Sequence, residues 1–141
     1  MSKVNWYGDD VQLRIMNASQ KALFAIAQQV IDQAKMNITD NGQVDTGFMR
    51  NSGYAADPDQ STYSDIGSSG TYASDAGGIV DRQAAQEVEI PTAGGPVAIA
   101  AFAADYALYQ EVATPFLYPA LEQVKSDVPD TMIEHVKKAE K

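Results

Sequence analysis

The feature that most constrains this chain is a long helical pattern near the N-terminus. No Gly or Pro occurs between Asp9 and Asp40, and apolar residues recur there at i, i+3 and i+4 spacings. The stripe comprises Val11, Ile15, Ala18, Ala22, Leu23, Ile26, Ala27, Val30, Ile31 and Ala34. Carboxylates such as Asp9 favour a helix start, because they accept backbone N–H bonds and complement the helix dipole. The sequence predicts a helix over 9–38, long enough to act as a spine.

The region 44–103 has the shorter patterns of a small antiparallel sheet. Phe48–Ala56 is interpreted as a strand or a turn that leads into one. Two strands, Gln83–Ile90 and Val97–Phe102, are expected to be joined by a hairpin at Pro91–Pro96. The expected arrangement is a β-meander of three to four strands.

The segment 57–81 interrupts this sheet region. It is rich in Ser, Gly and Asp and has few large aliphatic residues. The composition predicts a long flexible loop, or a hairpin with weak strands at Thr62–Ile66 and Thr71–Ser74. The two alternatives stay open at this stage.

The last part of the chain, 104–141, predicts a joint followed by a C-terminal helix. Pro115 breaks the chain, and Pro119 falls in the first turn of the helix that follows, where proline is tolerated. Pro129 lies inside the apolar stripe and predicts a kink, with Ser126 or Asp127 as the new cap. The expected fold is α+β in a single domain, 1–141, with an N-terminal arm at 1–8.

Composition limits the classes of function. Asp plus Glu number 19 against 10 Lys plus Arg, a net charge of -9, which gains nothing from phosphate counterion release and argues against direct nucleic-acid binding. The absence of cysteine excludes disulfides and thiolate chemistry. The N-terminal residues lack the apolar core of a signal peptide, and no run has the length of a membrane span. We therefore expect a soluble protein with no membrane partner.

The candidate chemical motifs favour a structural interpretation. Asp45–Gly47 spells the DTG triplet of aspartic proteases, but those enzymes end an apolar strand with it, and here it follows a helix. His135 has no partner at a catalytic or metal-binding spacing. The aspartates of 57–81 lack the ordered pattern of a calcium loop. We expect no enzyme activity, no catalytic residues, no cofactor and no metal.

Glu111 is the most informative carboxylate in the chain. It lies between Tyr109, Val112 and Phe116, in a stretch that otherwise favours burial. A buried carboxylate must be paired or hydrogen-bonded. We expect Glu111 to accept backbone N–H bonds, for instance at the start of the last helix.

Two motifs resemble a known family. VDTGFMRNS (Val44–Ser52) is similar to the family motif VDTG-x-L-R-x-S, with Met49 in place of its Leu. YALYQEVATPFLYPALEQV (Tyr106–Val124) is similar to YA-x-x-x-E-x-GT followed by PFL-x-PAL, with Ala113 in place of the Gly. The family is the tail-completion or minor tail (neck) proteins of tailed bacteriophages, named after the gene-ten product of an HK-type siphophage. The segment 57–81 is outside the resemblance.

The resemblance implies a structural virion protein of the phage head–tail junction, assembled in the host bacterial cytoplasm and located in the neck or tail of the virion. Its partners would be itself in a ring, a hexamer or a dodecamer, and neighbouring neck, connector and tail proteins. Genome DNA would pass through the ring without specific binding.

Two groups of residues follow as candidates. The first is a structural joint that fixes how the last helix leaves the sheet: Asp45, Thr46, Gly47, Arg50, Glu111, Thr114, Pro115, Phe116 and Pro119. The second is an interface of aromatic residues that supply contact area: Trp6, Tyr7, Tyr63, Tyr72, Tyr106, Tyr109 and Tyr118. Trp6 and Tyr7 either anchor the arm onto its own domain or contact a neighbouring subunit. Two alternatives remain, a small dimeric aspartic-protease-like enzyme using Asp45 and a Tyr-rich protein-binding module.

Overall fold

The structure is a computed structural model that describes residues 8–44, 46–74, 76–91 and 95–139, with the side chains of 8–16 and 139 left aside. The helices are α1 (Gly8–Asp40), α2 (Ala107–Ala113), α3 (Leu117–Val124) and α4 (Val128–Ala139). The strands are β1 (Gly53–Ala56), β2 (Gly70–Ala73), β3 (Ile79–Arg82) and β4 (Ile99–Phe102). Short 3-10 turns occupy Arg50–Ser52, Tyr63–Asp65 and Lys125–Asp127. The α+β class predicted from the sequence is confirmed.

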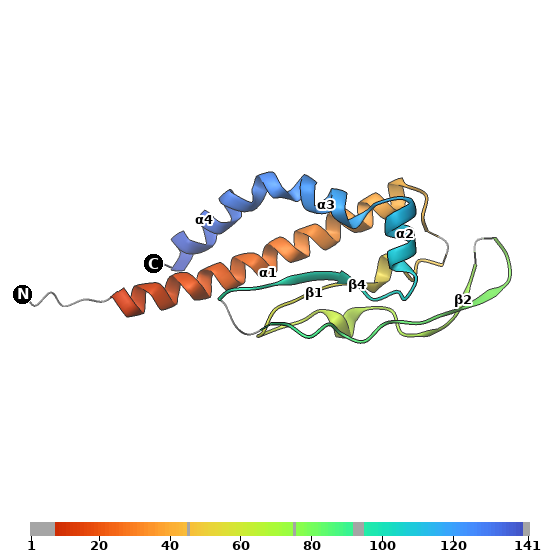
Figure 1. Ribbon diagram of the computed structural model, residues 1–141, viewed down its shortest axis with the longest axis horizontal. Helices are drawn as coiled ribbons and strands as arrows, with labels where there is room; N and C mark the ends of the chain where they lie inside the picture. The colour runs from red at the N-terminus through yellow and green to blue at the C-terminus, as the bar shows by residue number, and fades with distance from the viewer. Residues whose placement is uncertain (1–7, 45, 75, 92–94, 140–141) are drawn as a thin grey trace, which may run out of the picture.

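Helix α1 is the central element of the fold. It contacts α3 and α4 on one side and β1 and β4 on the other, so that it lies between a helical layer and a small sheet (Figure 1). The described part of the predicted apolar stripe is buried apart from Leu23, which is half-buried, and Ala22, Ala34 and Ile38 have no exposed surface. Alanines on this face allow the covering elements to approach closely. The predicted helix is confirmed and extends two residues further, to Asp40.

The C-terminal helix bends as the prolines predict. Pro119 lies in the first turn of α3, and Pro129 lies in the first turn of α4. Between the two helices, Lys125–Asp127 forms a 3-10 turn. The expected kink near Pro129 is therefore confirmed, and Ser126 and Asp127 lie inside the connecting turn. The kink lets α3 and α4 both follow α1 (Figure 1).

The strands pair differently from the expected meander. In the described residues, β1 pairs antiparallel with β4, and β2 pairs antiparallel with β3 in a separate sheet. Gln83–Ile90 forms no extended strand and touches the end of β4 through an isolated bridge between Ala84 and Ala104. The outer edge of β1 is already occupied, because Thr62 bonds to Ala55 through its backbone N–H and accepts from Ala55 N–H through its hydroxyl. The predicted strand at 83–90, and its expected hairpin pairing with Val97–Phe102, are wrong.

The segment 57–81 forms a hairpin for part of its length. The hairpin differs from the expected one: Thr71–Ser74 corresponds to β2, but its expected partner Thr62–Ile66 contains a 3-10 turn at Tyr63–Asp65, and β2 pairs with β3 instead. The hairpin turn carries Gly77 and Gly78, both at positive φ (96° and 86°), which glycine adopts without steric cost.

The sheet and α1 approach each other most closely at Gly53. A Cβ at this position would lie 2.8 Å from the Phe102 ring and 3.1 Å from a methyl carbon of Ile31. Glycine is required here because the Phe102 ring fills the space between β1 and α1. This contact directs Phe102 toward the helices that follow β4.

Candidate functional site

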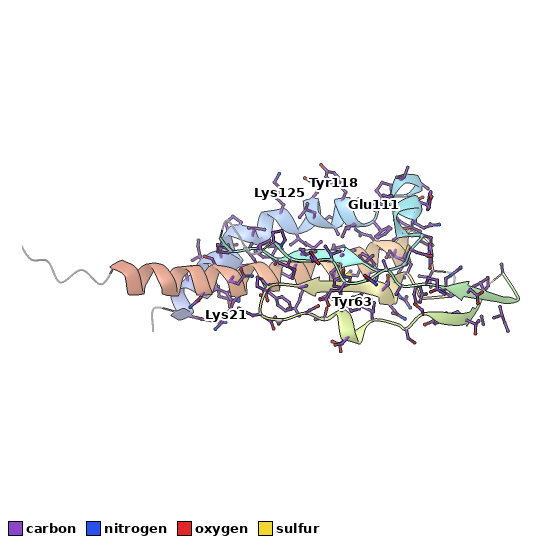
Figure 2. All side chains as sticks on the ribbon, turned by 60° about the horizontal axis from the view of Figure 1, so that its bottom comes forward. Lys21, Tyr63, Glu111, Tyr118 and Lys125 are labelled. Carbon is purple, nitrogen blue, oxygen red and sulfur yellow. The ribbon has the colours of Figure 1, made fainter. Side chains whose placement is uncertain are left out.

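The Glu111 carboxylate holds the start of α3. Its Oε2 accepts hydrogen bonds from the backbone N–H groups of Phe116 (2.7 Å) and Leu117 (3.0 Å), and its Oε1 accepts from Tyr118 N–H (2.8 Å). These are donors that a helix start leaves without intrahelical partners. The carboxylate therefore caps α3 from the preceding helix α2, which confirms the hydrogen bonding expected from the sequence. Figure 2 shows Glu111 of α2 and Tyr118 of α3 near each other.

The electrostatics of Glu111 reflect these contacts. Partial burial raises the pKa of its carboxyl group, but the three backbone N–H bonds outweigh burial, so that the net pKa lies below the ordinary value of 4.5. The group is therefore ionised at neutral pH. A negative charge at a helix N-terminus is also favoured by the helix dipole. A general acid needs the opposite, a raised pKa.

The turn that follows α1 is built around Gly47. Its φ is +79°, in the left-handed region, and its carbonyl accepts a bond from Asn51 N–H (2.9 Å). The Thr46 hydroxyl accepts a bond from Phe48 N–H (3.1 Å), as expected of a tight turn. Asp45, the first residue of the DTG triplet, lies outside the described residues. The turn leads into the 3-10 segment before β1.

Side chains from both sequence motifs pack in one core cluster. Phe48 and Met49 from the first motif and Ala107 and Phe116 from the second are all buried in it. The Phe116 ring meets the Phe102 ring edge-on, with centroids 5.1 Å apart. The residues that follow the turn therefore pack against Phe116 and Ala107 in one cluster.

Amide side chains at and just after the end of α1 form hydrogen bonds to the joint. Asn37 Nδ2 donates to the Phe116 carbonyl (3.1 Å), Asn41 Nδ2 to the Pro115 carbonyl (3.2 Å) and Gln43 Nε2 to the Thr114 carbonyl (3.0 Å). The Thr114 and Pro115 carbonyls lie between α2 and α3, and Phe116 is the N-cap residue of α3. These three amides were not predicted to belong to the joint. The available signal was the cluster of amide side chains at and just after the end of α1.

The remaining joint residues have smaller roles. Arg50 donates from Nη1 to the Thr39 hydroxyl (3.3 Å), so that it links the first motif to α1 and not to Glu111. The Thr114 N–H ends α2 by bonding the Gln110 carbonyl (2.8 Å). Pro119 packs into the first turn of α3. The joint therefore fixes the direction of α3 relative to α1.

The tyrosines divide into structural and exposed groups. The Tyr63 hydroxyl donates to the Ala85 carbonyl (2.7 Å), and the Tyr72 ring packs on Phe48. The Tyr106 ring lies under the Arg82 guanidinium, 4.8 Å from its carbon, and burial raises the pKa of Tyr106 although the Arg82 charge opposes the rise. Tyr63, Tyr72 and Tyr106 therefore contact other residues of their own chain. Trp6 and Tyr7 lie outside the described residues.

Tyr109 and Tyr118 belong to an exposed apolar surface. Tyr109 is 76% exposed on α2 and Tyr118 is 65% exposed on α3. Leu108 and Val112 on α2 and Leu121 on α3 are exposed as well. Tyr118 and Leu121 line one groove, and apolar side chains exposed together are typical of a binding surface.

An apolar groove lies beside this surface. It has a volume of about 420 Å³, and its walls come from α1, β4 and α3. Leu23, Ile26, Val30, Ala100, Leu117 and Leu121 line it. We call it the α1–α3 groove.

The described residues contain no group of three or more His, Asp or Glu side chains placed to hold a metal ion. A ring nitrogen of His135 lies 2.9 Å from the Thr131 carbonyl one turn earlier, a contact within α4. Within the described residues, no helix combines the length and apolarity that a membrane crossing needs.

Comparisons with known proteins found no relative. The sequence matches no protein-family model, and no curated protein or solved structure is significantly similar to it.

Proposed function

We propose that this protein is a structural component of a tailed-phage virion, located at the head–tail junction as a neck or tail-completion protein. It assembles into a ring that helps to join the DNA-filled head to the tail. The proposal starts from the resemblance of Val44–Ser52 and Tyr106–Val124 to the motifs of that family.

One observation carries the proposal. The two motifs, which lie far apart in the sequence, supply Phe48, Met49, Ala107 and Phe116 to one core cluster. Motif residues that pack together form one structural unit, whereas chance matches would be scattered over the fold. Glu111 acts in this unit as a cap for α3, a structural role. This favours a protein that acts by assembly over the aspartic-protease-like alternative.

The charge of the chain suits the proposed position. The net charge is -9. A ring of such subunits repels the phosphate backbone, so that DNA slides through it without sticking. A basic lumen in the assembled ring would contradict this part of the proposal.

Disruption of the gene in its phage tests the proposed function. We expect electron micrographs of the lysate to show DNA-filled heads and separate tails, and joined particles to return when the intact gene is supplied in trans. Joined, infectious particles in the absence of the protein would refute the proposal. Portal, capsid and tail-tube genes next to this gene are the expected genetic context.

A further inference from the structure

Strand β4 has a free edge beside the α1–α3 groove. The backbone N–H and C=O of Ala55 bond to Thr62, away from β4. In an antiparallel pair, two opposite residues either hydrogen-bond to each other or both direct their backbone N–H and C=O groups away from the partner strand. Ala100 lies opposite Ala55, so its backbone groups are directed away from β1. Phe102 does the same opposite Gly53. In the part of the chain that the structure describes, these groups have no backbone partner.

The α1–α3 groove is the place where a further strand would fit beside β4. Its floor is formed by Leu23, Ile26 and Val30 of α1, and its far wall by Leu117 and Leu121 of α3. Figure 2 shows β4 lying between α3 and β1 above α1, with the groove on the α3 side of β4. A strand placed there would extend the β1–β4 sheet and cover apolar side chains of α1. Exposed strand edges beside an apolar groove accept such strands.

The β2–β3 hairpin offers the complementary surface. It extends beyond the α2 end of the molecule, away from α3 (Figure 1). The bond from Ser74 N–H to the Gly78 carbonyl sets the hairpin register, and it turns the backbone groups of Ile79 and Asp81 outward, away from β2. Ile79 is 76% exposed. A two-stranded hairpin is marginally stable in water and gains from a third strand.

Charges at the two surfaces are complementary. Lys125 lies one turn after Leu121 on the groove wall, and Asp81 lies two residues after Ile79 on the same face of β3. These spacings are similar, about 6 Å along a helix and about 7 Å along a strand. Both charged side chains are exposed, and neither makes an ion pair within the described residues.

We propose that the β2–β3 hairpin of one copy docks in the α1–α3 groove of the next copy and adds β3 to the free edge of β4. Ile79 packs against Leu121, and Asp81 pairs with Lys125. The donor and the acceptor are different surfaces of the same chain, so that the contact is head-to-tail and repeats from copy to copy until a ring closes. This inference rests on the self-assembly stated in the proposed function and specifies its interface.

Disulfide trapping tests the contact, because the chain contains no cysteine. Ile79→Cys and Leu121→Cys are prepared as separate proteins and mixed under mild oxidation. Both positions are largely exposed, 76% and 48%, so that the substitutions leave the core intact. We expect a disulfide-linked heterodimer on a non-reducing gel, and a ladder of oligomers from the double variant.

The matched control replaces the acceptor position. Met36 is 58% exposed on α1, outside the groove lining, and Met36→Cys mixed with Ile79→Cys measures random collision. We expect the Ile79–Leu121 pair to cross-link at least about tenfold faster, the ratio that about 1.4 kcal/mol of contact energy gives. Equal rates for the two mixtures would overturn the inference.

Charge reversal provides a second readout. In the cross-linking pair, we expect Asp81→Lys or Lys125→Asp to slow trapping about threefold each, as for an exposed ion pair, and we expect the two together to restore it. Failure of the double reversal to restore trapping would refute the pairing of Asp81 with Lys125. If disruption of the gene leaves heads and tails unjoined but the trapping rates equal the control, this inference fails and the proposed function stands. If the trapping succeeds but virions form without the protein, the function fails and the interface stands.

Discussion

Replacement of Glu111 should weaken the start of α3 by an amount that its hydrogen bonds set. The bonds to Phe116 N–H and Leu117 N–H are partly buried, whereas the bond to Tyr118 N–H is exposed and can be replaced by water. Counting about 1 kcal/mol for each partly buried bond, we expect Glu111→Ala to lower the free energy of unfolding by about 2 kcal/mol. Glu111→Gln keeps one acceptor oxygen, and we expect a loss of about 1 kcal/mol. For a chain of this size, these losses correspond to melting temperatures lower by about 7 °C and about 3 °C.

The pH dependence of this loss distinguishes a charged cap from simple packing. Because folding lowers the pKa of Glu111 below 4.5, the unfolded chain binds this proton more tightly than the native state does. The contribution of the carboxylate is therefore fully present above the unfolded value and disappears as the pH falls below the folded one. We expect the difference between the wild type and Glu111→Gln to be largest near neutral pH and to shrink in acid.

Urea unfolding followed by circular dichroism at 222 nm measures these differences. Glu122→Gln is the matched control, because Glu122 is an exposed carboxylate on α3 with no hydrogen bond among the described residues. We expect its substitution to change the free energy of unfolding by less than about 0.5 kcal/mol. The reasoning is refuted if Glu111→Gln behaves like Glu122→Gln near neutral pH, or if its loss is the same in acid.

Two other substitutions test the joint. Phe116→Ala removes a buried ring that packs on Phe102, and we expect it to lower the free energy of unfolding by about 3–5 kcal/mol in the same urea assay. A decrease below about 1 kcal/mol would mean that the two motifs are not held together by this ring. Gly47→Ala places a side chain at φ +79°, although no atom lies closer than 3.7 Å to the new Cβ, so that the cost is backbone strain of about 1–2 kcal/mol. Gly47→Asn should cost less, because Asn tolerates this conformation better, and an equal or larger cost for Asn would contradict the explanation.

Local patterns in the sequence were sufficient for α1, for the kinked C-terminal helix and for the cap of α3. The apolar stripe of α1, the first-turn position of Pro119 and the kink before Pro129 depend on residues within one or two helical turns of one another. The role of Glu111 was also predictable, because its backbone donors lie five to seven residues away in the chain. Of the β2–β3 hairpin, only β2 was predicted, as Thr71–Ser74, and its partner was placed at Thr62–Ile66 and not at β3.

The tertiary structure decided the pairing of β1 with β4 and the α1–α3 groove. The strands Gly53–Ala56 and Ile99–Phe102 consist mostly of small residues buried or half-buried on both faces, so that neither shows the alternation that marks a partner. Gln83–Ile90 has such alternation, but among the described residues it makes only the isolated bridge between Ala84 and Ala104. The amides at the end of α1 find their carbonyls more than 70 residues later in the chain. Which of these long-range contacts form depends on which surfaces α1 can bury, and no local sequence pattern predicts them.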